Sequence, residues 1–326
     1  MYTTIYFILQ YKFCQEVWLW HEIFIKIFSD RKTFFKPEYP AKRLITIIIS
    51  TIMGLNRFLI KGSIKMAETG TVKIKNGKIE FVKFGKGKKP LVILPGLSYD
   101  GFFDKAAEIE RAYAAFADEF TVCLIDRNLT PEAGYSVKDM ADDTAEALNK
   151  LGVLCADFFG ASLGGMVAQT LAIDYPQLVN KLVLGSTLSR PNDAFLKNLT
   201  RWEDLAKNGD ITSLFDDMNK KIYSDYTLKK YAAVFAAIKP EVTAEKTARF
   251  VAYIGAAKNV DTYNSLNKIK AETLVIGASK DKVTTAAAAR EIAEKLHCKY
   301  HEYKKYGHAV FDEAAGYKKR VYDFLT

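Results

Sequence analysis

The sequence predicts an α/β fold: a mostly parallel central sheet with helices on both faces and one helical insertion. From residue 70 onwards, apolar runs of strand length alternate with stretches whose apolar residues recur every three or four positions. Such alternation is typical of a parallel sheet that is covered on both sides. One interval, residues 189–268, holds only helical patterns rich in Phe, Trp, Tyr and Leu. With 326 residues and 49% hydrophobic content, the chain is long enough for such a domain and its insertion.

The first 66 residues are expected to lie outside this fold, because they lack turn signals and regular periodicity. Their longest low-polarity run, Leu44 to Leu55, spans twelve residues, and a bilayer-spanning helix needs about 20. We therefore expect a non-core extension, with a signal or membrane anchor through residues 44–60 as the alternative. The abrupt change to patterned sequence after Met66 also suggests the hypothesis that translation begins there.

Most of the net charge of +9 lies in this extension. Residues 1–66 hold ten Lys and Arg against four Asp and Glu, a net of +6, which leaves +3 for residues 67–326. The body of the protein is nearly balanced and has no basic patch with interleaved aromatic residues, so nucleic-acid binding is not expected. Any membrane contact would have to come from the extension.

The four cysteines, at positions 14, 123, 155 and 298, show no metal-ligand spacing. They are also too few and too scattered for a secreted disulfide scaffold. We expect reduced thiols in a cytoplasmic protein that uses neither a metal nor an organic cofactor.

Strands and helices are predicted in order along the chain. Two alternating runs flank Asn76-Gly77, a pair that favours a tight hairpin turn. The strands are predicted at residues 71–75, 78–84, 91–94, 121–126, 156–161, 182–186, 273–277 and 299–303. The helices outside the insertion are predicted at residues 104–117, 137–150, 163–175, 284–296 and 309–324. The chain is thus divided into an extension (1–66), a core (67–188 and 269–326) and an insertion (189–268).

The motif Gly160-Ala161-Ser162-Leu163-Gly164 stands where a predicted strand meets a predicted helix. A G-x-S-x-G pattern in that context presents the serine on a sharp turn at the helix N-terminus, where the helix dipole is positive. A serine between glycines also serves as a simple helix cap. The strand before the motif and the helix after it favour Ser162 as a nucleophile.

A serine hydroxyl needs a base within hydrogen-bond reach, and the sequence offers four histidines. His21 lies in the extension, His297 ends a predicted helix and His301 lies within a predicted strand. His308 follows a strand in a loop, after Gly307, and is therefore the candidate base.

The base in turn needs a carboxylate that orients it. Asp281 follows the strand 273–277 in the same way that His308 follows the strand 299–303. Because loops at the carboxyl ends of neighbouring parallel strands share one edge of the sheet, these side chains can converge. Asp261, near the end of the insertion, is the reserve candidate for the acid.

Acyl transfer also requires backbone N–H groups that stabilise the developing oxyanion. One should come from Leu163, directly after the nucleophile. The other should come from the turn Leu94-Pro95-Gly96-Leu97, where Gly96 lets the backbone direct the Leu97 N–H toward the site. Asp126, which ends an earlier strand, is interpreted as structural, and Ser136 as a helix cap three residues before Asp139.

Together these motifs resemble the α/β-hydrolase family in its chain order of serine, acid and histidine. The resemblance extends over residues 71–326. It implies that Ser162 is the nucleophile, His308 the general base and then acid, Asp281 the orienting carboxylate, and that the amides of Leu97 and Leu163 form the oxyanion hole. It also implies that the insertion is a cap domain. Pro95-Gly96 stands where many members of the family have His-Gly, and a serine nucleophile argues against the branches that use aspartate.

The function predicted from the sequence is that of a serine hydrolase. It would cleave a carboxylic ester or related acyl bond of a small apolar substrate through an acyl-enzyme intermediate. Two alternatives stay open: a carbon–carbon bond hydrolase or aminopeptidase that uses the same triad, and a small-molecule receptor of this fold with little turnover. The substrate pocket is predicted under the insertion, and the aromatic and aliphatic residues expected to line it are Phe195, Leu199, Trp202, Leu205, Phe215, Met218 and Tyr223.

Overall fold

The computed structural model describes residues 67–237 and 240–326. Its eight strands are β1 (Glu68–Ile74), β2 (Gly77–Phe84), β3 (Lys89–Leu94), β4 (Phe120–Asn128), β5 (Ala156–Ala161), β6 (Val179–Gly185), β7 (Glu272–Ala278) and β8 (Lys299–Tyr303). Its α-helices are α3 (Ala106–Ala112), α4 (Val137–Lys150), α5 (Leu163–Asp174), α6 (Asp193–Lys207), α7 (Ile211–Ile222), α8 (Asp225–Lys230), α9 (Ala232–Ala237), α10 (Ala244–Lys258), α11 (Ala286–Leu296), α12 (Val310–Glu313) and α13 (Tyr317–Leu325). The predicted extension, with the suggested start at Met66 and the possible anchor at residues 44–60, lies outside the described residues.

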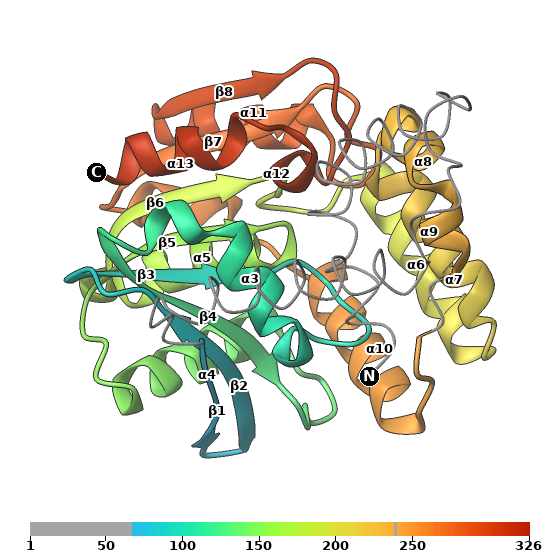
Figure 1. The fold of residues 1–326 in the computed structure, drawn as a ribbon, viewed down its shortest axis with the longest axis horizontal. Helices are drawn as coiled ribbons and strands as arrows, with labels where there is room; N and C mark the ends of the chain where they lie inside the picture. Colours follow the sequence, from blue (N-terminus) through green and yellow to red (C-terminus); the bar gives the residue numbers. More distant parts are fainter. Residues whose placement is uncertain (1–66, 238–239) are drawn as a thin grey trace, which may run out of the picture. The chain divides into compact units, whose positions relative to one another are not determined.

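The strands form one sheet in the order β1-β2-β4-β3-β5-β6-β7-β8 (Figure 1). β1 and β2 pair antiparallel in a hairpin around Asn76-Gly77, and β2 pairs antiparallel with β4. The remaining pairs, from β4–β3 to β7–β8, are parallel. The prediction of a mostly parallel sheet is confirmed.

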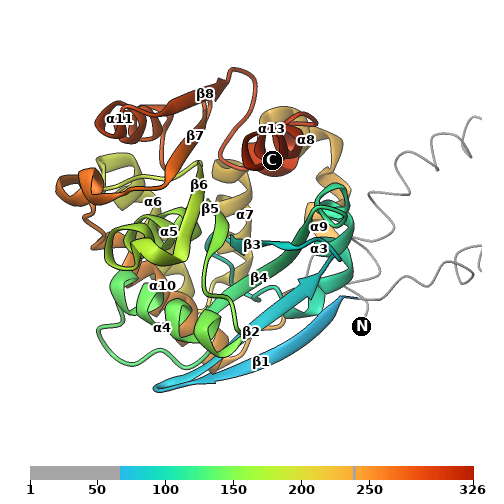
Figure 2. The same cartoon turned by 90° about the vertical axis from the view of Figure 1, so that its left-hand side faces the viewer.

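Helices cover both faces of this sheet, as predicted. Figure 2 shows α4, α5 and α11 on one side and α3 and α13 on the other. Each side has its own cluster of buried apolar residues: Leu148, Leu171 and Ile292 belong to the first, and Ile109 and Val321 to the second. The strands between them are nearly continuous apolar runs because their side chains are buried on both faces.

Helices α6 to α10 form the insertion between β6 and β7, and they lie toward the end of the sheet to which the arrows of the parallel strands β3 to β8 point (Figure 1). Trp202 of α6 is 2% exposed, and its indole N–H donates a 2.9 Å hydrogen bond to Asp217 of α7. This contact packs α6 against α7 near the carboxyl ends of the parallel strands. The residue boundaries of a separate cap domain stay a prediction.

Two predicted helices are interrupted in the structure. The stretch predicted as one helix over residues 104–117 consists of α3 between two short 3₁₀ turns, at Phe103–Lys105 and Ala114–Phe116. The stretch predicted over residues 309–324 is split into α12 and α13, because Ala314 adopts an extended backbone and Gly316 precedes the second helix. Glycine favours such a break, since it is a poor residue for a helix interior.

In the part of the chain that the structure describes, no helix has both the length and the apolar character that crossing a bilayer requires.

Candidate active site

Ser162 stands at the sharp turn between β5 and α5, with φ 52° and ψ −119°. A non-glycine residue rarely adopts a positive φ, and strain of this kind clusters at functional sites. The neighbouring glycines make room for the turn: a Cβ on Gly160 would lie 2.5 Å from the Gly164 carbonyl oxygen, and one on Gly164 would lie 2.0 Å from the Leu94 carbonyl oxygen. The G-x-S-x-G pattern is therefore a steric requirement of this turn.

The structure brings Ser162, His308 and Asp281 together from three different loops. His308 Nε2 lies 2.9 Å from Ser162 Oγ, and His308 Nδ1 lies 2.9 Å from Asp281 Oδ2. All three side chains are buried, with residue exposures of 8% for Ser162, 4% for His308 and 8% for Asp281. When the imidazole is neutral and carries its proton on Nδ1, Nε2 is free to accept the proton of the serine hydroxyl.

Asp281 is held ionised by its surroundings. Burial raises the pKa of this carboxyl. The charge and hydrogen bond of His308, together with hydrogen bonds from Thr284 and Val283, lower the pKa by more than burial raises it, so it lies below its usual range. Oδ1 accepts from the backbone N–H groups of Val283 and Thr284, at 2.8 and 3.0 Å. A carboxylate with these donors can orient the imidazole and stabilise its protonated form.

Thr284 is a site residue that the sequence analysis missed. Its hydroxyl donates a 2.8 Å hydrogen bond to Asp281 Oδ2, and its side chain is fully buried. The next residue, Thr285, has φ 74°, which is rare for a β-branched residue. A threonine three positions after an aspartate was the available signal, because such hydroxyls often bond to a nearby side chain or backbone group.

The amides predicted for the oxyanion hole adjoin the serine. Gly96 adjoins it, since an added Cβ on Gly96 would lie 3.4 Å from Ser162 Cβ, in van der Waals contact. Leu163 is the first residue of α5, so its N–H has no partner within the helix. Among the described residues, neither the Leu97 N–H nor the Leu163 N–H donates a hydrogen bond. Both donors are therefore available to a bound oxygen.

A cavity of about 130 Å³ lies beside Leu97, between the β3–α3 loop and α7. Phe215, Met218 and Tyr223, which were predicted as pocket residues, line it together with Leu97, Ser98, Tyr99, Asp100, Lys105, Asn219 and Ile222. The carbonyl of Ile222 also accepts a 2.9 Å hydrogen bond from the N–H of Ala309, the residue after His308. The cavity therefore adjoins both the candidate oxyanion loop and the loop of the base.

Four other predicted pocket residues do not line this cavity. Phe195, Leu199 and Trp202 are each only 2% exposed and belong to the hydrophobic core, and Leu205 packs against the same core. These residues lie on the face of α6 that packs against the rest of the protein, which explains their apolar character. A stripe of apolar residues on a helix predicts burial but does not distinguish a core from a pocket wall.

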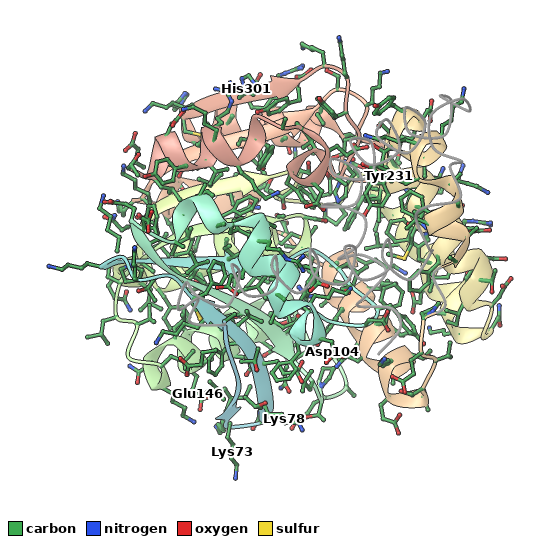
Figure 3. All side chains as sticks on the ribbon, in the orientation of Figure 1. Lys73, Lys78, Asp104, Glu146, Tyr231 and His301 are labelled. Atoms are coloured by element: carbon green, nitrogen blue, oxygen red, sulfur yellow. The ribbon has the colours of Figure 1, made fainter. Side chains whose placement is uncertain are left out.

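The remaining titratable candidates lie elsewhere. His297 is the C-cap of α11. His301 lies on β8, where Figure 3 labels it. Asp261 is exposed and accepts a hydrogen bond from the N–H of Tyr263, so it is not the acid beside His308. His21 lies outside the described residues.

Two predicted structural roles are confirmed. Ser136 and Asp139 form a capping box at the start of α4. Asp126 is 5% exposed and forms an ion pair with Arg127, at 3.1 Å between Oδ1 and Nη2, rather than with the imidazole. Over the described ranges, no three His, Cys, Asp or Glu side chains are grouped so as to hold a metal ion.

Comparison with known proteins places this geometry in a family. Residues 89–315, more than half of the 326-residue chain, match the model of the family described as alpha/beta hydrolase fold. A protein of Serratia proteamaculans named "Putative carbamate hydrolase RutD" is 27% identical over 165 residues, which are 50% of this chain and 62% of that protein. The chain thus matches less than two thirds of that relative's length. The 3-oxoadipate enol-lactonase 2 of Acinetobacter baylyi is 20% identical over 226 residues, 67% of this chain and 81% of that protein.

Solved structures show the same fold. The enol-lactonase of Burkholderia xenovorans superposes with a TM-score of 0.68 at 19% identity, covering 78% of this chain and 99% of that one. Sequence identity at this level supports the fold alone.

Proposed function

The chain belongs to the alpha/beta hydrolase family, and from that premise we propose that it is a serine hydrolase acting on a carboxylic ester or related acyl bond of a small apolar substrate. The observation that carries this proposal is the pair of hydrogen bonds that joins Ser162 Oγ to His308 and His308 to Asp281, each 2.9 Å long. This geometry supports the proposed roles of nucleophile, base and orienting carboxylate in acyl transfer.

The proposed reaction has two halves. Ser162 Oγ attacks the acyl carbon while His308 Nε2 accepts the hydroxyl proton, and the acyl oxygen becomes an oxyanion. As the tetrahedral intermediate collapses, His308 gives that proton to the leaving alcohol and an ester with Ser162 remains. Water then attacks this ester, His308 again accepts and returns a proton, and the carboxylic acid leaves with Ser162 restored.

The electrostatic part of the mechanism is assigned to the amides of Leu97 and Leu163. Neither donates a hydrogen bond to any other residue in the described parts of the chain, so both can be directed at the developing oxyanion. Fixed donors in a site with little water stabilise that charge without reorganisation. The low pKa of Asp281 supports the same mechanism, because an ionised carboxylate stabilises the protonated imidazole of each tetrahedral intermediate.

The cavity beside Leu97 favours a small group with apolar and polar parts, because Ser98, Asp100, Lys105 and Asn219 line it beside the apolar residues. Leu97, Phe215, Met218, Ile222 and Tyr223 provide apolar surface, and the volume of about 130 Å³ is modest. The relatives named as an enol-lactonase and a carbamate hydrolase support an acyl bond to oxygen or nitrogen as the scissile bond. We propose a short-chain ester or lactone as the substrate class.

The test is steady-state hydrolysis of p-nitrophenyl esters of increasing acyl length by the full chain. We expect repeated turnover by the wild type and a loss of several orders of magnitude in kcat for Ser162→Ala and His308→Ala. Ser136→Ala is the matched control, since it removes a hydroxyl whose role is helix capping. Release of about one equivalent followed by a stall would favour a receptor with little turnover. Retained turnover in Ser162→Ala would overturn the proposal.

A further inference from the structure

Arg127 is a buried cation at the end of β4, and its contacts lead to the loop before Leu97. The residue is 4% exposed. Its Nη1 donates to the carbonyl oxygen of Pro95 at 2.8 Å, and its Nη2 donates to the carbonyl oxygen of Gly96 at 2.9 Å. One planar guanidinium thus holds two successive carbonyls of the loop.

Asp126 and Tyr253 hold this cation in place. Asp126 Oδ1 lies 3.1 Å from Arg127 Nη2 and also accepts the Arg127 backbone N–H, at 2.9 Å. The guanidinium carbon lies 5.0 Å from the centre of the Tyr253 ring, which belongs to α10 of the insertion. A buried charge is costly unless it is paired and hydrogen-bonded. The ion pair and the ring compensate the charge, and the two carbonyls accept hydrogen bonds from Nη1 and Nη2. Among the described residues, the buried Nε has no hydrogen-bond partner.

The contact with Gly96 determines where the Leu97 N–H points. The Gly96 carbonyl and the Leu97 N–H belong to the same peptide unit, which is planar and trans, so the two groups point in opposite directions. When Arg127 fixes the carbonyl oxygen, it also fixes the direction of the N–H on the other side of the plane. A cation bonded to the carbonyl additionally polarises the amide and strengthens its N–H as a donor.

We propose that Arg127 is a positioning residue that orients and polarises the Leu97 amide of the oxyanion hole. This inference rests on the proposed function, because it assigns a task within the same reaction. Gly96 lies next to Ser162: a Cβ added on Gly96 would lie 3.4 Å from Ser162 Cβ. A small rotation of the Gly96–Leu97 peptide would therefore change the direction of the Leu97 N–H beside Ser162. Among the described residues, Arg127 forms no hydrogen bond with Ser162 or His308, so it acts on the site through the backbone of Pro95 and Gly96.

The contacts also determine which substitutions are informative. Lysine keeps the positive charge but lacks the planar fork that reaches two carbonyls at once. Methionine keeps much of the apolar stem and removes both donors. Arg201→Lys is the matched control, because Arg201 lies on α6 with a side chain 58% exposed and pairs with Asp217.

The experiment compares Arg127→Lys and Arg127→Met with the wild type in ester hydrolysis and in inhibition by phenylboronic acid, which forms a tetrahedral anion on a serine. Loss of an oxyanion donor costs about 100- to 1000-fold in kcat, and a misdirected donor should cost about 10- to 100-fold. We expect kcat to fall by that factor, KM to stay within about threefold, and the boronic acid Ki to rise in parallel with the loss of kcat. Arg201→Lys should leave all three unchanged.

Two outcomes would overturn the inference and leave the proposed function standing. The first is a folded Arg127→Lys variant with the kcat and Ki of the wild type. The second is a loss of activity that follows the melting temperature across the variants while Ki is unchanged, which would make Arg127 merely structural. A wild type that neither hydrolyses esters nor binds phenylboronic acid would overturn the proposed function and this inference with it.

Discussion

Asn198 donates from Nδ2 to the carbonyl oxygen of Lys282, at 2.7 Å, although 84 positions separate the two residues. Asn198 lies on α6 of the insertion, and Lys282 directly follows the candidate acid Asp281. A second asparagine of the insertion, Asn192, donates to the carbonyl of Thr284 at 3.0 Å. The insertion thus forms hydrogen bonds with the loop that carries Asp281, in addition to covering the strand ends.

The first prediction is that Asn198→Ala weakens both stability and activity. Asn198 is only 6% exposed, whereas Lys282 is an exposed residue, so the substitution removes a part-buried hydrogen bond, which costs about 0.5–1.5 kcal/mol. We expect a loss of that size in the free energy of unfolding in urea and a several-fold fall in kcat. Asn208→Ala, at an exposed asparagine after the same helix, is the control. Equal kcat values for the two variants would contradict a role for α6 in positioning Asp281.

The second prediction concerns acid stability. The pKa of Asp281 is lowered in the folded protein, and its unfolded value is about 3.9. A carboxyl with a depressed folded pKa stabilises the protein above its unfolded pKa, and this contribution is lost as pH falls through the folded pKa. We expect the free energy of unfolding of the wild type to fall more steeply below about pH 4 than that of Asp281→Asn.

Urea unfolding between pH 3 and pH 7 measures this difference. Asp118→Asn is a suitable control, because the Asp118 side chain is 88% exposed and pairs only with an exposed lysine. Its pH profile should parallel that of the wild type. Parallel profiles for all three proteins would mean that Asp281 is not stabilised as a carboxylate.

The third prediction concerns the support of the nucleophile. The hydroxyl of Thr187, which is fully buried, donates a 2.7 Å hydrogen bond to the carbonyl oxygen of Ser162. Thr187→Val removes this donor while keeping the shape, and we expect kcat to fall about fivefold with KM unchanged, since about 1 kcal/mol of positioning is lost. Thr170→Val is the matched control, because that hydroxyl bonds only to the Met166 carbonyl within α5. An equal effect of both substitutions would indicate a general loss of packing.

Local pattern predicted much of this fold from the sequence. The bounds of β5, β8 and α4 agree with their predicted ranges of residues 156–161, 299–303 and 137–150. Such elements are specified by their own residues: apolar runs bounded by turns for the strands, and an amphipathic stretch with a capping box for the helix. The interruption near Gly316 was not predicted, because three- and four-residue spacing is compatible with two short helices as well as with one long helix.

Part of the candidate site could likewise be predicted from the sequence, and part of it could not. Ser162, Asp281 and His308 follow strands, and a parallel sheet brings the ends of its strands to one edge, so their proximity could be predicted. The supporting contacts could not, because they join residues that are distant in the chain: Arg127 is 31 positions from Gly96 and Thr187 is 25 from Ser162. The assignment of catalytic roles to these residues stays a prediction.

The fourth prediction compares two glycines. A Cβ on Gly164 would lie 2.0 Å from the Leu94 carbonyl oxygen and 2.6 Å from that of Pro95, so Gly164→Ala must displace either the loop after β3 or the turn between β5 and α5. Gly255, within α10, has nothing within 4 Å of an added Cβ. We expect Gly255→Ala to raise stability by about 0.5–1 kcal/mol and Gly164→Ala to lower both the melting temperature and kcat. A Gly164→Ala variant with wild-type kcat would contradict the close approach of the loop after β3 to the turn between β5 and α5.

The fifth prediction addresses the choice of substrate through Met218, which lines the cavity beside Leu97 from α7. Met218→Ala enlarges this cavity, and each additional methylene of an acyl chain that becomes buried contributes about 0.8 kcal/mol, or about fourfold in kcat/KM. We therefore expect the chain-length optimum for p-nitrophenyl esters to move toward longer acyl groups in Met218→Ala, and toward shorter ones in Met218→Phe. Opposite shifts would identify the cavity as the acyl site, because a general loss of stability cannot change sign with the size of the side chain.

Leu214→Ala is the control for that experiment. Leu214 lies one turn earlier on α7, is fully buried and belongs to the core rather than to the cavity lining. Its truncation costs about 2–5 kcal/mol of stability, yet the chain-length optimum measured well below the melting temperature should match that of the wild type. If Leu214→Ala and Met218→Ala shift the optimum equally, α7 limits the substrate through its position, and the cavity does not select it through its shape.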